Sequence, residues 1–165
     1  MDKLKNLENL FHHELKDIYS AETQIIEALP EMEQQATNKN LRRAFSQHLE
    51  ETKLQKKRLE EIAEILEIDI KGVTCEAMQG LIKEAKSFLK EDAEDQVKDA
   101  GLIAKAQSVE HYEIAAYGTA LQYAKHLKHN EVVDLLNQTL EEESAADEKL
   151  TKIAVENINL QAKEA

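Results

Sequence analysis

Apolar residues recur every three or four positions along almost the whole chain, which is the spacing of one face of an α-helix. Near the N-terminus, for example, Leu7, Phe11 and Leu15 are followed by Ile18 and Ile25. Short polar breaks that contain capping residues or glycine interrupt this pattern and separate the helices. The pattern predicts four long helices, at about residues 4–36, 40–67, 96–127 and 131–161, and one shorter helix at about 75–90.

The lengths of the connections predict how these helices pack. The breaks at 37–40 and 126–130 are short, so the helices on either side of each break are expected to be antiparallel neighbours. A long crossover, which contains the short helix with Thr74 as its expected N-cap, joins the two hairpins. Two hairpins joined in this way have the topology of a ferritin-like four-helix bundle. We therefore expect an all-α fold in which residues 1–165 form one domain.

Composition and charge narrow the classes of partner. The 165 residues include one proline, four glycines and no tryptophan, which is typical of a mostly helical chain. The formal net charge of −12 opposes binding to nucleic acids and to anionic membranes, so we expect cations as partners and neither of those surfaces. The N-terminal residues lack the apolar run of a secretory signal, which predicts a cytoplasmic location. Because Cys75 is the only cysteine, an iron site within one chain must use oxygen and nitrogen ligands.

Each long helix is interrupted near the middle of its apolar face by an acidic or imidazole side chain. At about 100° of rotation per residue, Glu22 lies between Ile18 and Ile25 on the inward side of its helix. His48 lies on the line through Leu41 and Leu59 in the same way. The inward polar residues found by this argument are Glu22 in segment 4–36, His48 and Glu51 in 40–67, Glu110 and Glu113 in 96–127, and Glu143 and Asp147 in 131–161.

Taken singly, each of these residues has an ordinary explanation. A glutamate at the edge of an apolar face is usually solvated through its flexible side chain, and a histidine such as His48 is often a hydrogen-bonded core residue. Together they are harder to explain, because several carboxylates in one core repel one another and lose hydration unless a cation neutralises them. Six carboxylates and one imidazole suit iron or manganese, whereas a structural zinc site would use thiolates and more histidines. The sequence therefore predicts a buried metal site.

Four stretches of the chain carry the motifs of one protein family: residues 48–52, 75–78, 110–119 and 141–150. Through them, and over nearly its whole length, the chain resembles the YciE/YciF family of bacterial ferritin-like proteins, which are related to rubrerythrins. The resemblance implies a ferritin-like bundle with a di-iron centre formed by the carboxylates named above. It also implies a small dimer-like assembly and a link to stress responses.

Two departures separate this chain from the wider ferritin and rubrerythrin pattern. That pattern places Glu-x-x-His on the second and fourth long helices, whereas here the second helix has His48-x-x-Glu51 and the fourth has Glu143 followed by Asp147. A rubrerythrin would also carry a tail with four cysteines, which this chain lacks. Any electron donor must then be a separate molecule.

The leading functional hypothesis is a di-iron oxidase or peroxidase that oxidises Fe(II) with dioxygen or hydrogen peroxide. Two iron ions are the expected cofactors, with manganese or zinc as substitutes. The catalytic ligands in this hypothesis are Glu22, Glu110, Glu113 and Glu143, and the ligands that complete the set are His48, Glu51 and Asp147. The alternative is a non-catalytic helical interaction module or metal buffer. Iron storage in a hollow shell, a third reading, would require many subunits.

An aromatic pair suggests self-association. Tyr112 and Tyr123 lie on the side of segment 96–127 that faces away from the line of predicted ligands. Exposed aromatic side chains on a bundle often mark a partner surface. We therefore expect a homodimer that involves this face or the short helix at 75–90.

Overall fold

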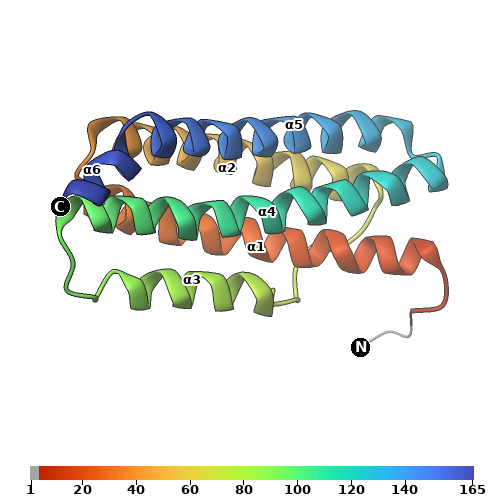
Figure 1. The fold of residues 1–165 in the computed structure, drawn as a ribbon. Helices are drawn as coiled ribbons and strands as arrows, with labels where there is room; N and C mark the ends of the chain where they lie inside the picture. The colour runs from red at the N-terminus through yellow and green to blue at the C-terminus, as the bar shows by residue number, and fades with distance from the viewer. Residues whose placement is uncertain (1–3) are drawn as a thin grey trace.

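The computed structural model describes residues 4–165, and over this range the elements are all helices. The four long helices lie alongside one another, and the short helix lies against only two of them, α1 and α4 (Figure 1). These elements are α1 (Leu7–Gln35), α2 (Lys39–Ile65), α3 (Glu76–Phe88), α4 (Asp95–Leu127) and α5 (Asn130–Ile153). Each long helix runs antiparallel to its hairpin partner, α1 to α2 and α4 to α5 (Figure 1). The all-α, ferritin-like bundle with an extra crossover helix is thus confirmed.

The helix ends differ from the predicted ones where capping chemistry decides them. The first helix begins at Leu7, because the Asn6 side chain accepts a hydrogen bond of 2.9 Å from the backbone N–H of Asn9. The cap of α3 is Cys75 and not Thr74, since the thiol sulfur accepts from the N–H of Met78 at 3.4 Å. The last predicted helix is divided into α5, a π-helical turn at Ala154–Ile158 and α6 at Asn159–Glu164.

The apolar core consists of two clusters, one in each half of the bundle. The cluster in the half covered by α3 includes Leu29, Phe45 and Met78, and the cluster in the other half includes Phe11 and Leu15. The polar residues predicted near mid-length separate these two clusters. Their side chains are surrounded by four helices that are held in place by apolar packing on both sides.

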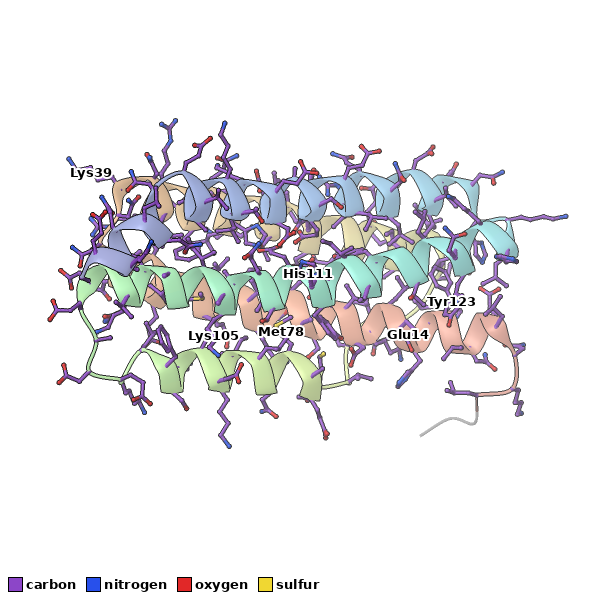
Figure 2. All side chains as sticks on the ribbon, in the orientation of Figure 1. Glu14, Lys39, Met78, Lys105, His111 and Tyr123 are labelled. Carbon is purple, nitrogen blue, oxygen red and sulfur yellow. The ribbon has the colours of Figure 1, made fainter. Side chains whose placement is uncertain are left out.

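Docking of α3 relies on a close approach at Gly101 of α4. Met78 of α3 is fully buried on the side of this helix that faces the long helices (Figure 2), and Lys105 of α4 pairs with Glu84 of α3 at 3.2 Å. Near the C-terminal end of α3, the ring of Phe88 lies directly over Gly101, so that a Cβ atom there would overlap the ring. Glycine at this position therefore provides the space that lets α3 pack closely.

We expect Gly101→Ala to destabilise the protein, although alanine normally favours a helix over glycine by about 1 kcal/mol. Displacing the Phe88 ring should cost about 1–3 kcal/mol and outweigh that gain. Gly118→Ala, on the same helix and with open space around the added methyl group, is the matched control and should stabilise. Thermal melts of the two variants provide the comparison. In a Phe88→Ala background, where the ring is absent, Gly101→Ala should raise the melting temperature relative to Phe88→Ala alone. Equal stabilisation by both single changes would contradict this account of α3 docking.

Tyr112 is not the exposed side chain that the sequence predicted. It is half-buried, its hydroxyl donates to Asp17 of α1 at 2.6 Å, and the same oxygen lies 2.9 Å from the sulfur of Cys75. The crossover covers this part of α4, which a helical-wheel argument cannot foresee. Tyr123 is also only partly exposed. The homodimer itself stays a prediction.

Candidate metal centre

Five polar side chains from all four long helices are buried together at mid-length. At least one ligand atom from each of His48, Glu110, Glu113 and Glu143 lies within 4.8 Å of the others. Glu22 of α1 adjoins this group, within hydrogen-bonding reach of Glu113 and close enough to Glu143 for repulsion between the two charges. Each of the five is at most 7% exposed. The structure therefore brings together five of the seven residues that the sequence singled out.

The α4 helix makes the largest contribution to the cluster because its residues recur on one face. Glu110 and Glu113 are three positions apart, and Tyr117 follows one turn later, so all three point into the bundle. The Tyr117 hydroxyl donates a short hydrogen bond to Oε1 of Glu22. The phenol thus fixes one oxygen of Glu22 and leaves Oε2 directed into the cluster without a partner.

Most polar atoms of the cluster lack hydrogen-bond partners. Both carboxylate oxygens of Glu113 and of Glu143 are buried and unpaired, as is Oε2 of Glu110. His48 Nε2 lies 3.1 Å from Oε1 of Glu110, but its ring is not oriented for a hydrogen bond. Buried polar atoms are normally paired, because burying one without a partner costs about 1–3 kcal/mol. Converging unpaired oxygens and one imidazole nitrogen form a donor set that a divalent cation would satisfy.

Burial and mutual repulsion also disfavour the ionised carboxylates when no cation is present. Burial is the largest influence on Glu22, and together with the nearby Glu143 it raises the pKa of Glu22 to about 8. Burial also raises the pKa values of Glu110 and Glu113 well above the usual range, with Glu143 again the main neighbour. A bound cation would reverse this preference, because carboxylates bind metals in their ionised form.

Glu51 and Asp147, the other two predicted ligands, lie at the edge of the cluster. Glu51 Oε2 is 3.8 Å from Nδ1 of His48, on the side of the ring away from Glu110, and Gln47 donates to Oε1 of Glu51. Asp147 accepts from Gln107 at 3.0 Å and approaches the exposed His111 at 3.2 Å. Both carboxylates therefore already have partners outside the buried group. The 3.8 Å between Glu51 and Nδ1 of His48 is too long for a hydrogen bond, so Nδ1 is also unpaired.

A partly buried ion pair next to the cluster was missed by the sequence analysis. Arg58 of α2 binds both carboxylate oxygens of Glu142 of α5, at 2.8 and 2.9 Å, and also donates to Thr139 at 2.7 Å. Gln55 donates to the same carboxylate at 3.1 Å. The Arg58 charge favours ionised Glu22, although less strongly than burial opposes it. The sequence feature that could have indicated this pair is the position of Arg58, one residue before Leu59 and at the edge of the apolar face of α2.

Gln55 and Thr52 of α2 are also buried beside the cluster, but their hydrogen bonds do not reach its side chains. Gln55 instead contacts Glu142, while the Thr52 hydroxyl donates to the backbone carbonyl of His48, one turn earlier on α2. That bond is local to the helix and does not reach the His48 ring. The hydroxyl that directly contacts a carboxylate of the cluster belongs to Tyr117.

The fold and the cluster together define a ferritin-like helical bundle with a buried site that could hold a metal ion. Comparison of the sequence with known families gives the specific assignment. The chain belongs to the family described as Domain of unknown function (DUF892), which matches residues 6–163. The chain is also similar over nearly its whole length to a YciF protein, described next, so the resemblance noted from the sequence motifs is confirmed.

Protein YciF of Escherichia coli K12 is 44% identical to this chain over 160 residues, which is 96% of each protein. The crystal structure of that E. coli stress protein matches with a TM-score of 0.91, over 94% of this chain and 99% of the other. YcfI of Rhodopseudomonas palustris is 46% identical over 92% of this chain and 97% of its own, with a TM-score of 0.90. A protein of Xanthomonas campestris, 20% identical, shares the fold with a TM-score of 0.76 over 97% of this chain and 100% of its own.

Proposed function

We propose that the protein is a di-iron carboxylate protein that oxidises Fe(II) with dioxygen or hydrogen peroxide as part of a bacterial stress response. The observation that carries this proposal is the convergence of unpaired carboxylate oxygens and one imidazole in the core. A buried group of this kind has no structural use comparable to its cost unless a cation binds there. The description of the similar E. coli YciF as a stress protein supports the physiological setting.

The residues that would hold iron are the five buried ones, Glu22, His48, Glu110, Glu113 and Glu143. A bound iron pair would supply the electrons that reduce the oxidant. At neutral pH the carboxyls with raised pKa values must release their protons as metal binds. Tyr117 would keep Glu22 in place during this change.

The test is to add Fe(II) to metal-free protein in air and to follow the absorbance of the ferric product. We expect faster oxidation than in buffer alone, and Glu110→Ala should reduce the acceleration by about 10- to 100-fold or more. Glu27→Ala, an exposed change on α1, is the control and should keep the rate of the unaltered protein. The same three proteins are then compared in the decay of hydrogen peroxide with an added reductant.

No acceleration over buffer, or equal rates in the unaltered protein and Glu110→Ala, would favour the second candidate function, a non-catalytic interaction module or metal buffer. One observation supports this candidate independently. The description of the R. palustris relative, 46% identical, suggests a structural role. Metal analysis of protein purified without chelators would then distinguish a metal buffer from a module that binds no metal.

A further inference from the structure

A cavity of about 180 Å³ adjoins the cluster in the half of the bundle covered by α3. His48 and Glu110 line one end of it, and Leu29, Phe45 and Ala106 line its middle. It reaches α3 at Ile82, so it crosses the core from the cluster towards the crossover helix. The cavity is therefore continuous with the candidate metal centre and extends well beyond it.

Small side chains create this space. Ala28 of α1, Ala44 of α2 and Ala106 of α4 all contribute to its wall. Larger side chains at these positions would extend into the space and fill it. In the opposite half of the bundle, the corresponding space is filled by Tyr117 and Leu121 together with other large side chains, which are at most 3% exposed. Close packing is the rule in protein interiors, so a cavity of this size beside a buried polar cluster points to a ligand.

The chemistry of the wall indicates which ligand would fit. Away from the cluster the lining is mainly aliphatic, with the aromatic ring of Phe45. At the polar end the lining is acidic, with the carboxyl groups of Glu51, Glu110 and Glu142, and these groups offer an anion no counter-charge. The remaining charged side chains of the lining, Glu31, Lys86 and Lys149, are exposed, so water hydrates their charges at the rim, and Lys149 also donates to Gln47 at 2.6 Å. An uncharged molecule suits both the apolar wall and the acidic end.

We propose that this cavity binds an uncharged, apolar small molecule of about the size of benzene and holds it against His48 and Glu110. An apolar cavity of about 150 Å³ is large enough for benzene or xenon, which sets the size of the ligand. Burial of its apolar surface provides the binding free energy. The proposal concerns a ligand site that extends beyond the metal centre, and it holds whether or not that centre turns over.

The test uses metal-free, chelator-treated protein with benzene as the probe, so that a failure of the iron oxidation assay does not affect it. Millimolar benzene should raise the melting temperature by roughly 3–5 °C in a saturable way. Ala106→Leu adds an isopropyl group inside the cavity and should abolish this shift. Ala115→Leu makes the same change at an exposed position of α4 and should leave the shift intact.

A second measurement covers the case in which Ala106→Leu does not fold. Xenon dissolved with the unaltered protein should give a bound ¹²⁹Xe resonance, which benzene displaces. No benzene shift together with no bound xenon would overturn the proposal, as would an equal benzene shift in a folded Ala106→Leu protein. Benzoate is similar in size to benzene but carries a negative charge. A larger melting shift with benzoate than with benzene would show that the site selects an anion, and this result would also overturn the proposal.

Discussion

The metal-free protein is expected to lose roughly 3 kcal/mol of unfolding free energy between pH 5 and pH 8 from Glu22 alone. The pKa of Glu22 is about 8 in the folded protein, compared with 4.5 for an ordinary glutamate. The folded state therefore binds more protons than the unfolded state between these values. The contribution of Glu22 to stability is largest below pH 4.5 and falls as the pH rises towards 8, and the raised pKa values of Glu110 and Glu113 act in the same direction.

Bound metal should reverse this trend, because the ligands then have to be ionised and protons compete with the cation. Urea denaturation at several pH values, with chelator and with metal, should give two curves of opposite slope. Glu22→Gln removes the charge at nearly constant volume, so it should flatten the chelated curve and reduce the melting difference between the metal-free and metal-bound forms. Glu27→Gln, exposed on the same helix, should change neither. Unchanged slopes in Glu22→Gln would mean that Glu22 does not titrate in the cluster.

Replacing Arg58 with methionine should cost about 3 kcal/mol of unfolding free energy. Arg58 makes two hydrogen bonds to Glu142 and one to Thr139, and its side chain is only 12% exposed. Removing the guanidinium leaves a partly buried carboxylate without its counter-charge, which costs more than the loss of a surface pair. It also removes the positive charge that favours ionised Glu22, so the pKa of Glu22 should rise further.

Lys53→Met is the matched control for Arg58→Met. Lys53 and Glu50 form a 2.7 Å pair on the same helix, but their side chains are 46% and 69% exposed. Such pairs contribute about 1 kcal/mol or less. Urea denaturation should therefore separate the two variants clearly, and Arg58→Met with Glu142→Leu should recover most of the loss. A cost of less than 1 kcal/mol for Arg58→Met would show that the ion pair is not important for stability.

The sequence was sufficient to predict the topology and the inward orientation of the five buried polar residues. Helical periodicity places Glu22, His48, Glu110, Glu113 and Glu143 on apolar faces, and long antiparallel helices bring those faces together. Burial then follows from the pattern, because the apolar neighbours on both sides of each residue must be packed. The role of these residues as metal ligands stays a prediction.

What the sequence could not predict depends on contacts between helices. Rotation about a helix axis places Asp147 near the inward face, but it does not show that Gln107 and His111 of α4 already engage its carboxylate. The same argument places Tyr112 on the outside of the bundle. It does not show that the start of the crossover covers this residue, whose hydroxyl contacts Asp17 and Cys75. The cavity was missed for a related reason, since each alanine in its wall is an ordinary helix residue when read alone.

The division of the core into two apolar clusters with a polar layer between them gives a bound cation a further physical role. Each hairpin can form from contacts that are close in sequence, whereas the cluster joins Glu22 of the first hairpin to Glu143 of the second. A cation held by both hairpins would be a reversible crosslink that closes a loop over most of the chain, and it would have to be released before the two hairpins separate. In a protein whose single cysteine cannot form an internal disulfide, the availability of metal would then set how long the native state lasts.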